Sequence, residues 1–154
     1  MRRKEQEITD QSEILDIISE ARVCRIGLVD GYTPYVVPVN FGFKNNIFYF
    51  HGAKSGKKID TLRKNPAVCV EIDILEAFEP AEDGNACDYG FAYRSIIARG
   101  TARCIEDPGE KKEALTVIVK KYAPDNPCDF PEASLNGTAV FAVAIEEVTA
   151  KRSS

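Results

Sequence analysis

Basic side chains are concentrated in one short stretch of this sequence, just after its single histidine. Residues 54–64 read KSGKKIDTLRK and hold five of the chain's 20 basic residues. A helix beginning near Ser55 would place Lys57 and Lys58 in its first turn, where the helix dipole disfavours each cation by roughly 0.3–1 kcal/mol. A bound anion would reverse this sign, because free backbone N–H groups, the Ser55 hydroxyl and two ammonium groups would converge on it. The stretch therefore predicts a phosphate site, with a solvated basic turn as the alternative.

Two predicted strand ends come shortly before the basic stretch and border the same region. Residues 38–41 end one strand and residues 50–53 end the next, so we expect them to be hairpin neighbours. Pro38 cannot donate a ladder hydrogen bond, which leaves neighbouring backbone groups free to bind a planar heterocycle between aromatic walls. His51 lies in the second segment. A lone histidine at a strand end is more often structural, but its place before the candidate phosphate site favours a position that faces a ligand.

Hydrophobic periodicity indicates the elements that must position these residues. Apolar stripes predict three helices, and alternating or continuous apolar runs predict six strands. Gly100, in the middle of one long strand, indicates a bulge or a sharp bend. We expect a small six-stranded β-barrel with helices rather than a doubly wound sheet. The predicted helices cover 11–21, 55–64 and 107–122, the strands cover 23–29, 35–41, 47–50, 68–74, 93–105 and 138–148, and a long loop covers 76–90.

Composition and charge limit the classes of function. The chain has 154 residues, 44% of them hydrophobic, which is typical of one soluble globular domain. Its net charge of -4 disfavours a general nucleic-acid binder. No apolar run is long enough to cross a membrane, and the basic start is not followed by an apolar stretch as in a secretory signal, so we expect a cytoplasmic protein.

The cysteines do not indicate disulfides or a metal site. There are five of them, with long separations and no C-x-x-C pair, which is typical of reduced thiols. Cys24, Cys69 and Cys104 lie in apolar runs, where we expect small buried side chains. With one histidine in the chain, we predict no metal centre.

Short motifs along nearly the whole chain resemble the 5-nitroimidazole resistance (Nim) proteins. These proteins belong to the FMN-binding split-barrel superfamily related to pyridoxamine 5'-phosphate oxidase. No single motif decides the resemblance, but the order and spacing of the set do. The motifs are YVVPVNF at 35–41, FYFHGA at 48–53, Gly56-Lys57-Lys58, Asn65-Pro66, Ala86-Cys87-Asp88, Tyr93-Arg94-Ser95 and Gly100.

The resemblance implies one split-barrel domain over residues 1–154 and a homodimer that holds FMN at the subunit interface. Each part of the implied site matches a motif of this sequence. The residues 93–95 are expected to come from the partner subunit; the alternative is that they are simply the start of a strand. The implied contacts are Val37, Pro38, Val39 and Asn40 with the flavin ring, Ser55, Lys57 and Lys58 with the phosphate, His51 beside the flavin, and Tyr93, Arg94 and Ser95 across the interface.

The activity that the resemblance implies is FMN-dependent reduction of a nitroimidazole or a similar electron-poor small molecule. Flavin N5 would pass a hydride equivalent to the acceptor, His51 would supply the proton, and the loop at 76–90 would cover the site. A non-catalytic flavin- or haem-binding redox module remains an alternative, as does a binder of phosphorylated ligands without a redox cofactor. A true pyridoxamine 5'-phosphate oxidase is less favoured, because that enzyme uses a C-terminal segment with Trp and this chain has no Trp.

Overall fold

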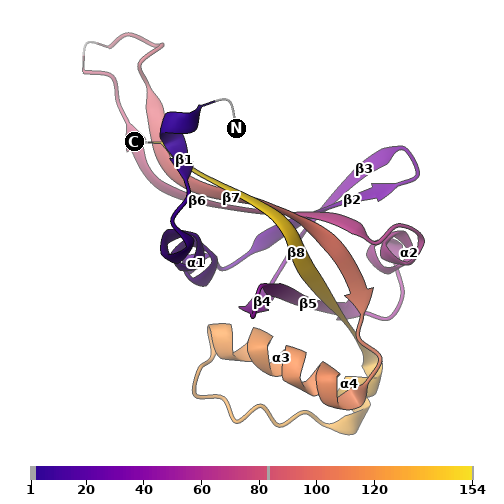
Figure 1. Cartoon of the computed structure of the whole chain (residues 1–154). Helices are drawn as coiled ribbons and strands as arrows, with labels where there is room; N and C mark the ends of the chain where they lie inside the picture. Colours follow the sequence, from indigo (N-terminus) through magenta and orange to yellow (C-terminus); the bar gives the residue numbers. More distant parts are fainter. Residues whose placement is uncertain (1–2, 83, 154) are drawn as a thin grey trace.

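The computed structural model describes residues 3–82 and 84–153, and its main feature is one antiparallel sheet that curls on itself (Figure 1). The strand order is β3-β2-β6-β7-β8-β5-β4, and β1 pairs with β8. In chain order the elements are η1 (Lys4–Gln6), β1 (Glu7–Ile8), α1 (Gln11–Glu20), β2 (Cys24–Asp30), β3 (Thr33–Val39), β4 (Phe41–Lys44), β5 (Ile47–Ala53), α2 (Lys57–Lys64), β6 (Ala67–Glu79), β7 (Gly90–Cys104), α3 (Pro108–Tyr122), α4 (Glu132–Gly137) and β8 (Thr138–Ser153).

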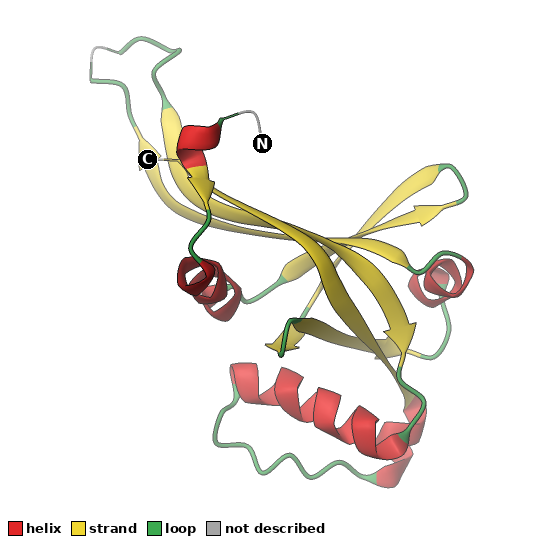
Figure 2. Cartoon of the chain, in the orientation of Figure 1, coloured by secondary structure: helices red, strands yellow, loops and turns green. Residues whose placement is uncertain are grey.

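The inner face of the sheet forms the core. Alternate residues of its strands point inward, so that Ile26, Val70, Ile72 and Ile96 are almost completely buried. α1 lays one apolar stripe on this core, as its sequence pattern predicts, and Ile17 is fully buried there. The helices lie around the sheet (Figure 2), with α3 packed against β4 and β5. The predicted class, mainly β with helices, is confirmed.

The bulge predicted at Gly100 is also confirmed. The pairing of β7 with β8 shifts register between Arg99 and Gly100. A side chain at this position would collide with the neighbouring strand, because a Cβ atom on Gly100 would lie 2.1 Å from the carbonyl oxygen of Ala144. Glycine is therefore required where the two longest strands bend together.

The single strand predicted at 35–41 is wrong, because the chain divides there into two strands. β3 ends at Val39 and pairs with β2, whereas β4 begins at Phe41 and pairs with β5 at the other end of the strand order. The Phe41 N–H donates to the Tyr122 hydroxyl at 3.0 Å instead of to a strand, and that hydroxyl donates to the carbonyl oxygen of Arg22 at 2.9 Å. Only β4, and not the end of β3, forms the expected hairpin with β5. With β1 in addition, the described residues form eight strands rather than six.

The loop predicted at 76–90 is shorter than expected, because residues 76–79 belong to β6 and Gly90 begins β7. β6 continues to Glu79 and β7 begins at Gly90, so the two form a hairpin that projects from the barrel (Figure 1). Their register shifts between Leu75 and Ala77, which interrupts the alternation that marks a strand in a sequence. Exposed aromatic rings pack along this hairpin, with Phe78 centred 5.2 Å from Phe91. Residue 83, in the connection, lies outside the described residues.

Three smaller expectations also change. β8 extends past the predicted end to Ser153, and the short helix α4 follows the proline-rich segment, where no helix was predicted. Cys24 is buried as predicted, but Cys69 is half-buried and Cys104 is exposed. Cys104 is the last residue of β7 and lies opposite the buried Phe141, but its own side chain is exposed. None of the described helices combines the length and the apolarity needed to cross a bilayer.

Candidate functional site

The N-terminus of α2 carries no side-chain cap. The helix begins at Lys57, two residues later than predicted, and its N-cap is Gly56, with φ 115° and no side chain to accept a backbone N–H. The first N–H groups of any helix lack acceptors within that helix, so those of α2 are available to an anion. Ser55 lies outside the helix and is exposed, and makes no capping bond. The predicted start at Ser55 is wrong, but Lys57 and Lys58 do lie in the first turn.

The two lysines of this turn point to different neighbours. The Lys57 ammonium lies 3.5 Å from an Asp30 carboxylate oxygen and 4.7 Å from the ring centroid of Tyr35, so it links α2 to the β2–β3 hairpin. The Lys58 ammonium donates to the carbonyl oxygen of His51 at 3.4 Å and lies 5.6 Å from the ring centroid of Phe50. These contacts of Lys57 have no signal in the sequence, because they join distant segments.

Lys58 is a partly desolvated cation. Burial lowers the pKa of its ammonium group below the ordinary value of 10.5. Among the described residues, no carboxylate lies within ion-pair distance of it. An anion that approached the N-terminus of α2 would therefore meet an ammonium group whose charge is not yet compensated.

His51 lies near the end of β5, next to this ammonium group. The residue is exposed, but burial of part of the ring lowers its pKa below 6.5, and the positive charge of Lys58 lowers it further. The imidazole is therefore mainly neutral at pH 7. In this form one ring nitrogen can donate a hydrogen bond and the other can accept one.

The end of β3 does not pair with β5, the strand that carries His51, so the hairpin predicted between 38–41 and 50–53 forms only from Phe41 onward. Val37, Pro38 and Val39 pair only with β2 among the described strands, so the other edge of β3 is open. Phe41 lies opposite Phe50 in the β4–β5 ladder, and Asn40 lies outside the ladders of both β3 and β4. The Asn40 side chain donates to the carbonyl oxygen of Arg22 at 3.4 Å. The contacts of Lys57 with Tyr35 of β3 and of Lys58 with His51 of β5 connect both strands to the N-terminus of α2.

Tyr93, Arg94 and Ser95 lie far from this group within one chain. Arg94 is opposite Arg152 of β8, whereas His51 is opposite Val140 of the same strand. At about 3.3 Å per residue, the two positions are roughly 40 Å apart along the strand. Arg94 forms ion pairs with Glu20, at 2.8 Å, and with Glu76. The predicted site residues therefore fall into two groups that a single chain cannot bring together.

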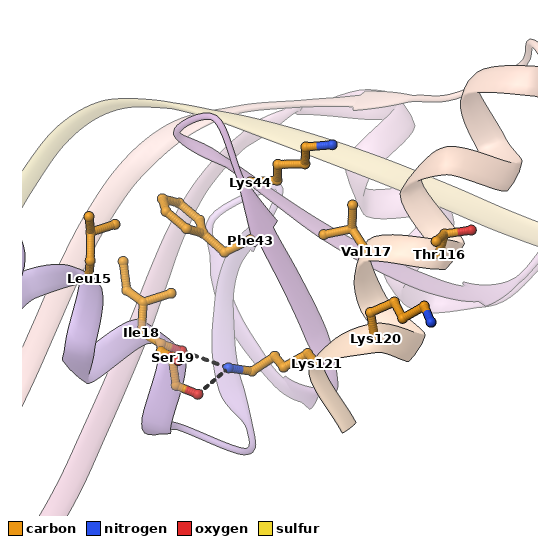
Figure 3. A pocket seen from close by; sticks show the side chains of 9 residues that line it. All are labelled: Leu15, Ile18, Ser19, Phe43, Lys44, Thr116, Val117, Lys120 and Lys121. Atoms are coloured by element: carbon orange, nitrogen blue, oxygen red, sulfur yellow. Dashed lines mark hydrogen bonds between the residues drawn. The ribbon is translucent and has the colours of Figure 1, made fainter. Parts of the chain in front are cut away.

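Two cavities among the described residues lie away from His51. One, of about 550 Å³, lies between α1, β4 and α3 (Figure 3), and the other, of about 730 Å³, lies between α3 and the β4–β5 hairpin. Neither is lined by a predicted site residue. The sequence did not indicate the first cavity, because its walls come from three separate segments.

Comparison with known proteins assigns the family. Residues 10–152 match the family described as pyridoxamine 5'-phosphate oxidase. The chain belongs to this family. No curated protein is significantly similar to the chain in sequence.

Solved structures agree with this assignment. A protein from Bacteroides thetaiotaomicron, provisionally described as a 5-nitroimidazole antibiotic resistance protein, is 31% identical with a TM-score of 0.85, over 95% of this chain and 86% of that one. The flavocytochrome Anf3 from Azotobacter vinelandii shares 23% identity (TM-score 0.87, 100% and 72% covered), and an FAD and heme binding protein from Mycobacterium smegmatis shares 20% (TM-score 0.88, 96% and 73% covered). The predicted split-barrel fold of the pyridoxamine 5'-phosphate oxidase family is confirmed.

Proposed function

We propose that this chain is a cytoplasmic, flavin-dependent oxidoreductase of the Nim type. It binds FMN at the interface of a homodimer and reduces a nitroimidazole or a similar electron-poor small molecule. The observation that carries the proposal is the N-terminus of α2, which has no side-chain cap and carries Lys57 and Lys58 beside His51. The family of the chain supports the proposal. The solved structures similar to the chain include proteins described as a flavocytochrome and as an FAD and heme binding protein.

The residues at α2 fit a phosphate group. Gly56 adds no side chain in front of the helix, and a Cβ atom at this position would meet nothing within 4 Å, so a ligand can approach the backbone. Two ammonium groups and the free N–H groups provide both charge and hydrogen-bond donors. A single terminal phosphate matches this donor set, which is the reason for preferring FMN.

A second copy of the chain would complete the site. Val29, Val36 and Ile97 lie on the outer face of the sheet, and are 45%, 59% and 39% exposed. These apolar side chains alternate with charged ones such as Arg25 and Glu71 on the same face, and a mixed surface of this kind, next to an open strand edge, suits contact with another subunit. Because Arg94 and His51 lie opposite positions of β8 that are roughly 40 Å apart along that strand, Tyr93, Arg94 and Ser95 would reach the flavin from the partner, as the resemblance implies.

In this arrangement FMN, when bound, would supply the redox step, passing a hydride equivalent from N5 to the acceptor. The chain would do the rest. Lys57 and Lys58 would hold the phosphate, and the backbone from Val37 to Asn40 would border the ring. His51 would donate the proton. Its lowered pKa makes the protonated form the minor one at pH 7, and a phosphate beside Lys58 would raise that pKa by offsetting the ammonium charge.

The visible absorption spectrum of the purified protein tests the cofactor, followed by heat release and chromatography of the chromophore. We expect flavin bands and released FMN. A colourless protein that also fails to bind added FMN would overturn the proposal. Sedimentation should show a dimer, and a flavin-loaded monomer would contradict the shared site.

Turnover separates the enzyme from a redox module. With an artificial reductant and a nitroimidazole, we expect the bound flavin to be reoxidised faster than free FMN, and His51→Ala to retain flavin but lose this reaction. Reoxidation no faster than that of free FMN would instead favour a non-catalytic flavin- or haem-binding module. Full activity of His51→Ala would make the histidine structural.

A further inference from the structure

A second candidate binding site lies between α1, β4 and α3, separate from the N-terminus of α2 (Figure 3). Its volume of about 550 Å³ is within the range of small-molecule sites. None of its lining residues belongs to the proposed flavin site. The cavity is lined by Leu15, Ile18, Ser19, Phe43, Lys44, Thr116, Val117, Lys120 and Lys121.

The floor of the cavity is apolar. Leu15 leaves 49% of its surface exposed although it belongs to the amphipathic helix α1, and it faces Phe43 and Val117 across the opening (Figure 3). A narrow crevice of about 30 Å³ shares Leu15, Ile18 and Phe43 with the cavity and continues between them to Phe48 in the core. An elongated or flat apolar group could therefore lie on this floor with one end pointing inward.

The rim of the cavity is cationic. Three of its nine lining residues are lysines and none is acidic, in a chain whose net charge is -4. The Lys121 ammonium donates to the carbonyl oxygens of Ile18 and Ser19 at 2.7 and 2.8 Å, and that of Lys120 donates to the carbonyl oxygen of Pro124 at 2.6 Å. Neutral carbonyl groups orient these charges but do not cancel them.

The positive charges of Lys121 and Lys44 are not balanced by a neighbouring carboxylate among the described residues. Burial and the neighbouring charge of Arg22 lower the pKa of Lys121 below 10.5. The side chain of Lys44, which lines both this cavity and the neighbouring one, has no ion pair or hydrogen bond to any described residue. The cavity thus presents an apolar floor between cations that lack a carboxylate partner.

We propose that this cavity binds a small amphipathic anion, namely a carboxylate carried on an acyl chain or an aryl group. The apolar part would cover Leu15, Phe43 and Val117, and the carboxylate would lie at the rim near Lys44 and Lys121. Inorganic phosphate would leave the floor unused, and a cationic amphiphile would be repelled by the rim. The proposal does not depend on the flavin site.

Calorimetry with decanoate, below its micelle concentration, tests this on the full-length protein as purified. We expect one site per chain, and dissociation constants raised at least about tenfold by Leu15→Glu and by Lys44→Glu, which place a carboxylate at the floor and at the rim. Both side chains are exposed, so both variants should fold. Lys112→Glu is the matched control, because it makes the same charge change in the neighbouring cavity on α3 and should leave the affinity unchanged.

Three results would overturn the proposal. The first is no saturable binding of decanoate to the wild-type protein. The second is equal affinity for decyltrimethylammonium, which has the same chain and the opposite charge. The third is binding that survives Leu15→Glu and Lys44→Glu but is lost in Lys57→Glu/Lys58→Glu, which would place decanoate at α2.

Discussion

The N-termini of the longer helices are built in two different ways. α1 and α3 each begin after an aspartate: Asp10 accepts the Ser12 N–H at 2.9 Å, and Asp107 accepts the Glu110 N–H at 2.8 Å. α2 begins after Gly56, which offers no side-chain acceptor. Where stability alone selects the residue, an acidic cap is favoured by both hydrogen bonding and the helix dipole. The absence of such a cap at α2 leaves that terminus open to an external anion.

The lysines sharpen the same contrast. Lys120 and Lys121 lie in the last turn of α3 and donate to backbone carbonyl oxygens, a position that the helix dipole also favours. Lys57 and Lys58 lie in the first turn of α2, where the dipole opposes them. Contacts within the fold account for the first pair and, through Asp30 and Tyr35, partly for Lys57, whereas Lys58 has no carboxylate partner among the described residues.

Removing the charges at α2 should have the largest effect. We expect Lys57→Glu/Lys58→Glu to weaken FMN binding by about a hundredfold or more, because two charge-assisted contacts to the phosphate are replaced by repulsion. The free energy of unfolding of the flavin-free protein should change by less than about 1 kcal/mol, since the gain from acidic residues in a first turn is offset by loss of the contact between Lys57 and Asp30. Flavin titration and urea unfolding measure the two quantities.

The matched control for this double variant lies at the other end of the same helix. Arg63→Glu/Lys64→Glu makes the same charge change in the last turn, where the dipole favours cations. Here FMN should remain bound, and the free energy of unfolding should fall by a few tenths to about 1 kcal/mol. Equal loss of FMN from both variants would mean that net charge, and not the helix terminus, holds the phosphate.

The open cap itself can be tested at Gly56. Its φ of 115° is a conformation that residues with a side chain rarely adopt, and we expect Gly56→Ala to lower the free energy of unfolding by about 1–3 kcal/mol. A clash would not contribute, because the added Cβ atom meets nothing within 4 Å. Gly137→Ala is the control, as it also adds its Cβ to open space and has no positive φ, and it should change stability by no more than about 0.5 kcal/mol. Equal effects of the two variants would contradict a strained cap.

Removing an aspartate cap should lower stability without affecting FMN binding. We expect Asp107→Ala to lower the free energy of unfolding by about 1 kcal/mol, through loss of its bond to the Glu110 N–H. FMN affinity should not change. Asp107→Asn retains an acceptor and should restore most of the stability, as urea unfolding would show. Loss of FMN from Asp107→Ala would connect α3 to the cofactor and weaken the contrast between the helices.

Patterns among neighbouring residues predicted much of the fold and the basic part of the candidate site at α2. Three of these patterns act through neighbouring residues: the apolar stripe of α1, the proline near the start of α3 and the glycine at the bend of β7. The position of Lys57 and Lys58 in a first turn likewise follows from a few adjacent residues, even though the helix starts at Lys57 rather than at Ser55.

Contacts between distant segments account for what the sequence did not predict. The break after Asn40 depends on the hydrogen bond from Phe41 to Tyr122, which no local pattern reveals. The cavity at α3 joins Leu15, Phe43 and Val117 from three separate elements. The outer end of the β6–β7 hairpin was predicted as loop, because the register shift between Leu75 and Ala77 interrupts the alternation of side chains.

The smallest expected effect is a pH dependence of stability that comes from His51, next to the uncapped N-terminus of α2. Burial and the charge of Lys58 lower the pKa of His51 in the folded chain below 6.5, its ordinary value and that expected in the unfolded chain. The unfolded chain therefore binds more protons as the pH falls through 6.5, and the contribution of His51 to stability is lost in that window. The urea midpoint of the flavin-free wild-type protein should fall accordingly.

His51→Gln should remove this part of the pH dependence, while the part due to carboxylates remains. Imidazole titrates between about pH 5 and 8. The contribution of His51 is therefore the difference between the urea midpoints of the two proteins, measured over this range. Added FMN should reduce the difference, because a phosphate beside Lys58 offsets the charge that lowers the pKa of His51. Parallel curves without FMN would show that burial and the Lys58 ammonium do not lower the pKa of His51 in the folded chain. An unchanged difference with FMN bound would place the phosphate away from α2.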